Sequence, residues 1–327
     1  MSVLLVTRSD DNGAVDLVAR ALVERGAVPI RLDTDRYPQQ LSISTAYVAG
    51  IARRTLSLPE QTIDLGEVSA SWYRRFFAGG SLPSSLGDTR EACVHESRRT
   101  LYGTIASLGC FELDPLIAVR EADHKELQLR RAAACGLLVP ATLFSNDPAA
   151  VRAFFDDVGG RMVTKMQSSF AIYRGGVENV VFTNVVHRRE LDDLEGLRFA
   201  PMIFQEWLDK ELELRVTVVG RQAFAASIDS QRRQQTAVDW RRDGVGLLDE
   251  WQPYVLPADI EQALLRLTES FHLNYAAADI VLTKDGRHVF LELNAGGEWL
   301  WLARAPGLPI AEALADTLLD KVPRTSR

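Results

Sequence analysis

The chain has 327 residues, of which 46% are hydrophobic and 25% are charged; this is ordinary for a globular protein, and the length allows two or three domains. The formal net charge of −7 argues against general nucleic-acid binding, although it would not repel a basic peptide. The three cysteines form no metal-binding pattern, no apolar run has the length of a membrane span, and the N-terminus lacks the features of a signal peptide, so we expect a cytoplasmic protein.

Residues 1–117 predict an α/β domain. A strand, an amphipathic helix and a second strand open the chain as a βαβ unit, which predicts a parallel sheet, and no Gly-x-Gly-x-x-Gly motif marks a dinucleotide site. The expected elements are strands Ser2–Thr7, Val28–Leu32, Leu41–Val48, Ala52–Leu58 and Val68–Phe77 and helices Ala14–Arg25 and Thr89–Leu108. Arg74 and Arg75 follow two aromatic residues in the last strand. They either clamp an anion or a substrate, or form the solvated face of that strand.

Residues 118–200 carry two lysines that suit a phosphate. Lys125 lies in the first turn of the predicted helix Ala122–Cys135, where a cation is unfavourable unless an anion is near; a solvated lysine is the alternative. Lys165 lies among apolar residues in the predicted strand Arg161–Met166, and a buried lysine needs a partner. The serine- and glycine-rich segment 167–176 is predicted either as a flap over phosphates or as a hairpin loop.

Further elements are expected in the centre and in the C-terminal part, residues 201–327. The strands are Leu138–Leu143, Val177–Thr183, Pro201–Trp207, Glu213–Val219 and Gln222–Ile228, and the helices are Pro148–Val158, Arg188–Glu195, Pro257–Phe271 and Ile310–Leu319. The arginine-rich segment Asp229–Gly246 lacks helical periodicity and is predicted as a loop that faces either a substrate or solvent.

A hairpin near the C-terminus, Ala277–Asn294, predicts the most specific chemistry. Both arms are rich in strand-forming residues, and Asp285-Gly286 between them is a strong turn signal. If these two residues form the loop, Asp279 lies directly opposite Glu292, with Cβ atoms about 5 Å apart.

Two opposed carboxylates repel each other unless a cation lies between them. Asn294 follows on the same face, and its amide oxygen adds a third hard ligand, which suits Mg²⁺ better than zinc. Val281 and Phe290 are expected beside the acids, which is unusual for a fully solvated face. The alternative is an exposed edge hairpin with solvated acids.

Taken together, these segments resemble the ATP-grasp ligases, and most closely the macrocyclases that mature microviridin-type peptides (graspetides). The resemblance covers essentially the whole chain, and the closing Asp279…Glu292-x-Asn294 pattern is its most specific part. The other stretches that carry it are Leu5–Thr7, Asp10–Asn12, Arg31–Arg36, Trp72–Arg75, Lys125–Leu129, Val163–Met166, Phe170–Tyr173, Glu211–Arg215, Asp239–Arg241 and Trp251–Tyr254. One departure is Ala295, where the family pattern has proline, and this leaves the shape of the next loop open.

The resemblance implies an α/β chain, α+β overall, with an ATP-grasp fold: a pre-ATP-grasp domain (1–117), a central subdomain (118–200) and a C-terminal subdomain (201–327). It also implies ATP and Mg²⁺ as cofactors. The implied catalytic residues are Arg215 and Lys165; the ATP-binding residues are Lys125, Lys165, Gln205, Glu206, Trp207, Leu208 and Glu213; the metal ligands are Asp279, Glu292 and Asn294.

The implied activity is ATP-dependent macrocyclisation of a ribosomally made precursor peptide. An Asp or Glu side chain of the peptide becomes an acyl phosphate, and a Thr or Ser hydroxyl then displaces phosphate to form an ester. An amide to Lys, a ligase that joins separate carboxylate and amine substrates, and a catalytically silent binding protein are the alternatives. The acidic residues Glu190, Asp192 and Asp193 are candidates for binding a basic residue of the leader peptide, or form a solvated helix face. A homodimer is expected from the resemblance, with no nucleic-acid or membrane partner.

Overall fold

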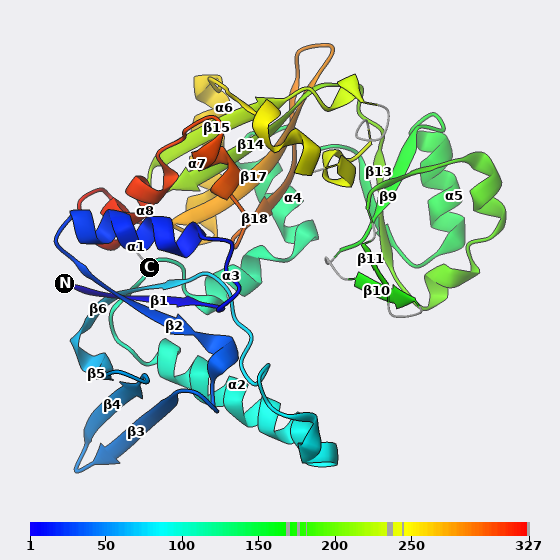
Figure 1. Cartoon of the computed structure of the whole chain (residues 1–327). Coiled ribbons are helices and arrows are strands. Elements are labelled where there is room, and N and C mark those ends of the chain that lie inside the picture. The colour runs from blue at the N-terminus through cyan, green and yellow to red at the C-terminus, as the bar shows by residue number, and fades with distance from the viewer. Residues whose placement is uncertain (168–170, 175–176, 181, 234–237, 244, 326–327) are drawn as a thin grey trace.

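The computed structural model describes residues 1–167, 171–174, 177–180, 182–233, 238–243 and 245–325. Its architecture combines a parallel sheet with antiparallel sheets and covering helices, so the predicted α/β class with an N-terminal parallel sheet is confirmed (Figure 1). No helix in these ranges is long and apolar enough to cross a membrane.

The first domain is built on a four-stranded parallel sheet in the order β2-β1-β6-β7. These strands are β1 (Ser2–Thr7), β2 (Val28–Asp33), β6 (Val68–Tyr73) and β7 (Phe111–Glu112). The apolar run of β1 is buried on both faces: Val3 and Leu5 pack beneath helix α1 (Ala14–Glu24), whereas Leu4 and Val6 pack with helix α2 (Arg90–Ala106). This is the burial that a parallel strand requires.

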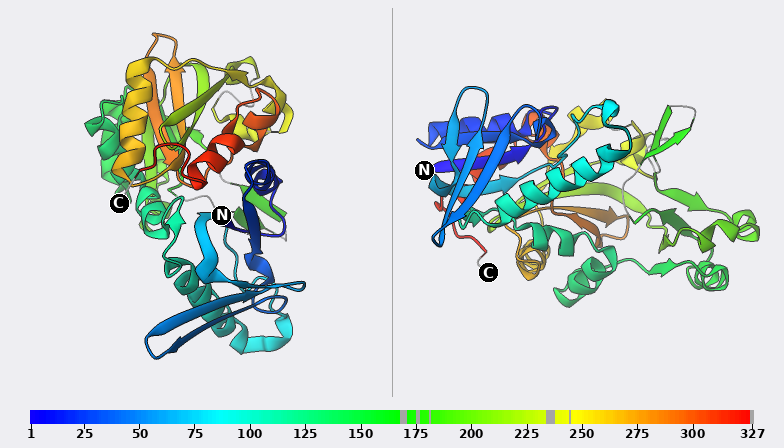
Figure 2. Two further views of the ribbon diagram at one scale, coloured as in Figure 1. Left: turned by 90° about the vertical axis from the view of Figure 1, so that its left-hand side faces the viewer. Right: turned by 90° about the horizontal axis from the view of Figure 1, so that it is seen from below.

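A small antiparallel sheet extends the first domain. It consists of β3 (Ser42–Val48), β4 (Ile51–Ser57) and β5 (Thr62–Asp64), in that order. Strand β3 is therefore an edge strand. Figure 2 shows its hairpin with β4 at the end of the molecule away from the C-terminal sheet.

The central sheet has the order β12-β9-β13-β8 and carries helix α5 (Pro148–Asp157). Its strands are β8 (Thr142–Ser145), β9 (Met162–Lys165), β12 (Asn184–Val186) and β13 (Met202–Glu206), and β10 (Ala171–Arg174) pairs separately with β11 (Val177–Val180). The helix expected over Arg188–Glu195 is instead two short 3-10 turns, Arg188–Asp192 and Glu195–Arg198.

The C-terminal sheet is antiparallel, in the order β16-β15-β14-β17-β18. Its strands are β14 (Lys210–Val219), β15 (Gln222–Ile228), β16 (Gln252–Pro253), β17 (Tyr275–Thr283) and β18 (His288–Asn294). Helix α6 (Ala258–Ser270) packs on one face. Helices α7 (Leu300–Arg304) and α8 (Ile310–Leu318) belong to the core that includes Val219 and Tyr275.

The helix expected over Ala122–Cys135 is observed as α4 (Lys125–Ala134), which begins three residues later than expected, and a helix that was not predicted, α3 (Leu116–Ala122), precedes it. The chain is extended at His124, and the Gln128 side chain donates a hydrogen bond to the Ala122 carbonyl at the end of α3. As a result Lys125 is the first residue of its own helix.

The division of the chain at residues 117 and 200 stays a prediction. In the structure β13 hydrogen-bonds within the central sheet, and α3 and α4 pack against the C-terminal sheet.

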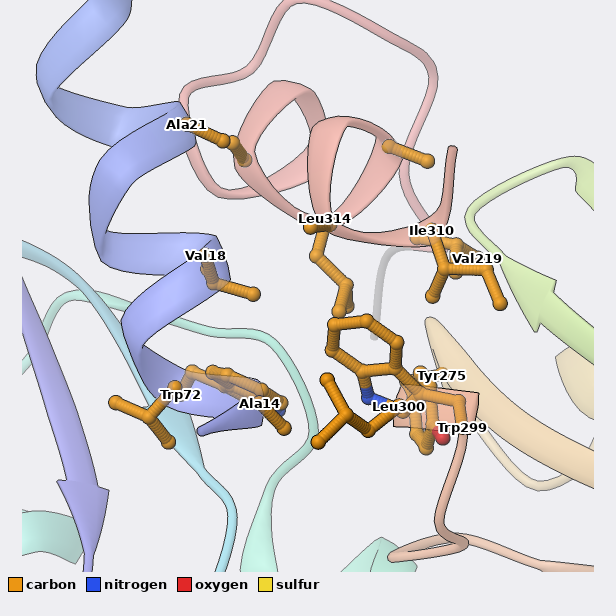
Figure 3. Packing of buried hydrophobic residues seen from close by; sticks show 14 of the residues in the cluster. Ala14, Val18, Ala21, Trp72, Val219, Tyr275, Trp299, Leu300, Ile310 and Leu314 are labelled. Carbon is orange, nitrogen blue, oxygen red and sulfur yellow. The ribbon is translucent and has the colours of Figure 1, made fainter. Parts of the chain in front are cut away.

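The first domain and the C-terminal sheet share one hydrophobic core. Figure 3 shows Ala14, Val18 and Ala21 of α1 facing Leu314 of α8, with Trp299 between the two domains. The bidentate ion pair between Arg25 and Asp316 lies at the same junction, with Nε–Oδ1 at 2.7 Å and Nη2–Oδ2 at 3.0 Å. The two units are therefore packed as one body.

The C-terminal hairpin has the expected pairing of Asp279 with Glu292, but not by the expected route. Thr283 hydrogen-bonds to Arg287, so the turn has three residues, Lys284–Gly286, with Gly286 at a φ of 83°. This shifts the register by one residue, and a β-bulge between the turn and the acids shifts it back.

The bulge also changes which side chain of β18 lies beside the two acids. Phe290, expected beside them, packs in the core with Ile280, whereas Leu291 lines the same cavity as Glu292. The extra residue in β18 places two successive side chains on one face.

Candidate active site

A cavity of about 610 Å³ lies where the central and C-terminal sheets meet, and this is a normal size for a small-molecule site. One wall is Gln205–Leu208, at the end of β13 and the connection to β14. The opposite walls come from β14, β17 and β18 and from the segment after β18. All the residues expected at the ATP and metal sites except Lys125 line this cavity, and Lys125 lines an adjoining cavity of about 310 Å³ with Lys165 and Glu292.

The two expected acids and the amide lie together at the floor of the cavity. Asp279 and Glu292 are directly paired across β17 and β18. The Asn294 Nδ2 atom lies 3.1 Å from Glu292 Oε1 and 3.5 Å from Asp279 Oδ2, so the amide sits between the carboxylates. This donor set is hard oxygen chemistry of the kind that Mg²⁺ prefers. Among the described residues no group of three or more His, Cys, Asp or Glu side chains could hold a metal, so the protein ligands available here are the two carboxylates and the amide oxygen.

Basic side chains from three elements approach the two acids. Arg215 of β14 donates from Nη1 to Asp279 Oδ1 at 2.7 Å, and Lys125 of α4 donates from Nζ to Glu292 Oε2 at 2.6 Å. Burial of Glu292 opposes its ionisation, but Lys125 and Lys165 outweigh burial and lower its pKa. Burial raises the pKa of Asp279 even though Arg215 opposes it.

Lys165, on β9, faces the acids from the central sheet and is half-buried. Burial lowers its pKa and the nearby Lys125 adds to that effect, while Glu292 opposes it. A site with this many cations around two carboxylates is suited to a polyanion that brings its own divalent ion.

The expected nucleotide wall is built from backbone and anchored side chains. Gln205 Nε2 donates to Thr142 Oγ1 at 2.9 Å, and Glu206 Oε1 accepts from the Ala141 N–H at 2.9 Å. Both side chains thus brace the strand, and Trp207 and Leu208 follow at the cavity wall.

Glu213 is buried in the cavity wall on β14. Its Oε1 atom accepts from Lys210 Nζ at 3.0 Å and from Ser230 Oγ at 2.7 Å. Burial raises its pKa, and Lys210 opposes that shift. The sequence did not point to Lys210. Residues three apart on a regular strand lie on opposite faces, so the spacing of Lys210 and Glu213 does not predict a contact.

Arg241 is a second unassigned residue of the site. It lines both cavities, and its Nε and Nη2 atoms bind the buried Asp239 at 2.8 Å and 2.6 Å. Asp239 is itself held by the Thr183 N–H at 3.2 Å. In the sequence it is one of four arginines in a loop and belongs to the Asp239–Arg241 stretch that carries the family resemblance, but no role was assigned to it.

Arg74 and Arg75 both pair with an anion of the protein itself. The anion is the side chain of Glu298: Arg74 Nη2 lies 2.6 Å from Glu298 Oε2, Arg75 also pairs with this carboxylate, and Asn12 Nδ2 donates to it at 2.9 Å. The first domain therefore reaches the segment that follows Asn294.

The three candidate leader-binding acids lie elsewhere. Glu190, Asp192 and Asp193 are exposed on the central unit and line neither cavity. Glu190 already accepts the His187 N–H at 2.7 Å and so caps a 3-10 turn. Within the predicted flap, residues 168–170 and 175–176 lie outside the described ranges.

Known proteins resemble this chain along its whole length. A family profile described as "MvdD pre-ATP grasp domain" matches residues 2–120. A Chryseobacterium gregarium RiPP-associated ATP-grasp ligase, solved with ADP and a leader and core peptide, is 38% identical with a TM-score of 0.96, covering 100% of this chain and 98% of that one.

Two structures from Microcystis aeruginosa MRC are also similar. The macrocyclase MdnC, bound with precursor peptide MdnA, is 43% identical with a TM-score of 0.89, covering 98% of this chain and 100% of that one. The macrocyclase MdnB is 37% identical with a TM-score of 0.80, covering 97% and 99%. No curated protein sequence matches the chain.

Proposed function

This chain belongs to the ATP-grasp ligases that include the microviridin-type macrocyclases, and on that basis we propose that it closes rings in a ribosomally made precursor peptide at the expense of ATP. The observation that carries the proposal is the gathering of Lys125, Lys165 and Arg215 on the opposed carboxylates Asp279 and Glu292. A binding protein without catalysis has no use for this arrangement.

The residues fit ATP and magnesium. Asp279, Glu292 and Asn294 would hold Mg²⁺, which neutralises phosphate charge when bound. Lys125 and Lys165 would hold phosphate oxygens, the Gln205–Leu208 wall would hold the base, and the unshared oxygen of Glu213 would accept from a ribose hydroxyl. Arg215 and Lys165 would stabilise the charge of the transferring phosphoryl group. The relatives solved with ADP and with precursor peptide support a nucleotide and a peptide as ligands.

The proposed reaction is activation of a side-chain carboxylate followed by ring closure. The Asp or Glu carboxylate of the peptide attacks the γ-phosphate, giving an acyl phosphate and ADP. A hydroxyl of Thr or Ser then adds to the acyl carbon, loses its proton and expels inorganic phosphate, leaving an ester. No enzyme nucleophile is needed. The ester rather than an amide is supported only by the resemblance of the Trp251–Tyr254 and Phe170–Tyr173 stretches to the ester-forming branch.

The leader of the precursor would bind apart from the cavity. Asp192 and Asp193 are solvent-exposed on the central unit and are free to meet a basic leader residue, whereas Glu190 has its structural capping bond. The leader and core peptides in the related ligase support a bipartite substrate.

The proposed homodimer has a candidate surface in the first domain. Strand β3 is at a sheet edge, and Ser42–Val48 contains no charge and no proline, the features that usually protect an edge from pairing. Tyr47 and Val48 at its end are 68% and 69% exposed. Two copies of β3 would pair about a two-fold axis. The cytoplasmic location is supported by three free cysteines and by the need for ATP.

Incubation with Mg·ATP and a synthetic precursor peptide tests the proposal. The peptide would come from a short neighbouring gene rich in Thr, Ser, Asp and Glu. A macrocyclase product is lighter by one water per ring, ligation of a second molecule adds mass, and a silent binding protein leaves both peptide and ATP unchanged. Mild alkaline hydroxylamine then opens esters and leaves amides intact, which separates the two ring chemistries.

A further inference from the structure

We propose that Arg74, in the first domain, is a positioning residue for the ligase reaction: it holds the Gly296–Glu298 loop, and that loop holds Arg215 against Asp279. The inference builds on the proposed function and adds to it a residue outside both ATP-grasp sheets.

Arg74 is fixed at the end of the first-domain sheet. Its backbone N–H donates to the Val6 carbonyl at 2.9 Å, and its side chain is 2% exposed. From there Nη1 donates to the Gly296 carbonyl at 2.7 Å and lies 3.4 Å from the Gly297 carbonyl, while Nη2 pairs with Glu298 Oε2 at 2.6 Å. One guanidinium therefore engages all three residues of the loop.

The same loop contacts the proposed catalytic arginine. The Glu298 carbonyl accepts from Arg215 Nη2 at 3.0 Å, and Arg215 Nη1 donates to Asp279 Oδ1 at 2.7 Å. Because a guanidinium is a planar, rigid fork, the carbonyl that holds one of its arms also sets the direction of the other.

The loop packs too tightly to shift without consequence. A Cβ atom at Gly297 would lie 2.7 Å from Arg215 Nη2 and 2.5 Å from the Ala277 Cβ, both far below van der Waals contact. The Gly297 carbonyl also accepts from the buried Tyr275 hydroxyl at 2.5 Å. Any displacement of this segment moves Arg215, or breaks its bond to Glu298.

Two other arginines provide matched controls. Arg75 pairs with the same Glu298 carboxylate and is 31% exposed, and within the described ranges it has no bond to a loop carbonyl. Arg25 forms a bidentate pair with Asp316 at the same domain junction, remote from the cavity. Arg75→Met tests the loss of a charge on Glu298, and Arg25→Met tests the loss of a domain-bridging ion pair.

The experiment compares Arg74→Met, Arg74→Lys, Arg75→Met and Arg25→Met with the unaltered chain. Mg·ADP affinity is measured by calorimetry, and kcat and KM for ATP from ADP formation with the precursor peptide. We expect Arg74→Met to lower kcat by about 10- to 100-fold, as a small misplacement of a catalytic group does, while Mg·ADP affinity and KM for ATP stay within about 2-fold. Arg74→Lys should recover part of the rate, Arg75→Met should stay within about 3-fold, and Arg25→Met should lower the melting temperature but not kcat.

The inference is overturned if Arg74→Met has the same kcat as Arg75→Met. It is also overturned if Arg25→Met and Arg74→Met lower the melting temperature equally and lower kcat equally. A crystal structure of Arg74→Met decides the matter independently of turnover: Arg215 and the Gly296–Glu298 loop in unchanged positions would also refute it. If the unaltered chain binds Mg·ADP but processes no peptide, the proposed function fails, and that structure still tests the role of Arg74.

Discussion

At the scale of single residues, the two carboxylates of the cavity have opposite environments although they face each other. Lysines from α4 and β9 outweigh burial at Glu292 and lower its pKa, whereas burial dominates at Asp279 and raises its pKa in spite of Arg215. Lys125 and Arg215 each occupy a carboxylate oxygen through a direct hydrogen bond.

Glu292→Gln should abolish ring closure with the fold retained. The amide keeps the shape of the side chain but removes the charge that a divalent ion requires, so we expect turnover to fall by about 100-fold or more. Mass spectrometry of the peptide reports the rings, and circular dichroism with a melting curve reports the fold. Full activity in this variant would exclude the hairpin as the metal site.

Arg241→Met should lower kcat/KM by about 10-fold or more, because its guanidinium is held rigidly beside the acids by Asp239. Its neighbour is the control: Arg242 binds the Thr183 carbonyl at 2.7 Å and Asn184 Oδ1 at 2.8 Å and does not line the cavity. Arg242→Met should therefore stay within about 2-fold on the same scale. Equal losses of kcat/KM in the two variants would show that activity depends on the loop that carries both arginines and not on Arg241 itself.

Asp114→Asn should change how stability depends on pH. Asp114 is buried, and burial raises its pKa although the Asn274 and Tyr275 N–H groups oppose this. A carboxyl with a raised folded-state pKa contributes stability below its unfolded pKa, about 3.9, and loses that contribution as pH rises through the folded value. The free energy of unfolding of the natural chain should thus fall relative to Asp114→Asn as pH rises above about 4. Urea titrations at several pH values measure this, and a constant difference would contradict it.

At the scale of elements, the C-terminal hairpin shows how two local irregularities can cancel. The three-residue turn displaces the strands by one residue, and the bulge in β18 restores the register just before the acids. Side-chain alternation in a strand has a period of two, so without the bulge Glu292 would point into the opposite core. The pairing of Asp279 with Glu292 was predictable, but the side chain beside them was not.

Gly286→Ala tests the turn. Gly286 has a φ of 83°, and an alanine there should reduce the free energy of unfolding by about 1–2 kcal/mol. Gly103 is the matched position: it lies within α2, and a Cβ there would meet nothing within 4 Å. Gly103→Ala should stabilise the protein by about 0.5–1 kcal/mol. Chemical denaturation gives both values, and a stabilising Gly286→Ala would refute the left-handed turn.

At the scale of the whole molecule, the first domain packs tightly against the C-terminal part and contacts a loop of the candidate active site. Helices α1 and α8 share a core, Arg25 and Asp316 bridge the same junction, and Arg74 reaches the loop that follows the proposed metal ligands. The central unit contributes Lys165 and the Gln205–Leu208 wall from its own sheet. The cavity is therefore lined by the central and C-terminal parts of the chain, and the first domain contacts one of its walls through Arg74 and the Gly296–Glu298 loop.

The free edge of β3 predicts the oligomeric state. The chain should be a dimer in light scattering at micromolar concentration, and Ala46→Lys, which places a charge on this exposed edge strand, should shift it to monomer with an unchanged melting profile at low concentration. Lys introduced in place of the exposed Ala200, on the central unit, is the control and should leave the dimer intact. A monomeric natural chain, or a dimeric Ala46→Lys, would remove β3 as the interface.

The sequence by itself determined what depends on neighbours along the chain. Strand-forming residues, helical periodicity and the Asp-Gly signal located most elements to within a few residues. The same signal placed the C-terminal hairpin whose arms carry Asp279, Glu292 and Asn294, although their pairing depends on a turn and a bulge that were not predicted. The local settings of Lys125 and Lys165 marked them as candidates for a phosphate partner, and the family resemblance assigned them to ATP. Only the tertiary structure decided the break between α3 and α4, the bulge and the hydrogen bond from Lys210 to Glu213. It also decided the position of Arg241 beside the acids and the contact of Arg74 with Gly296, which lies 222 residues further along the chain. Those contacts arise from the packing of separate units, and no local pattern of side chains encodes which distant surfaces will meet.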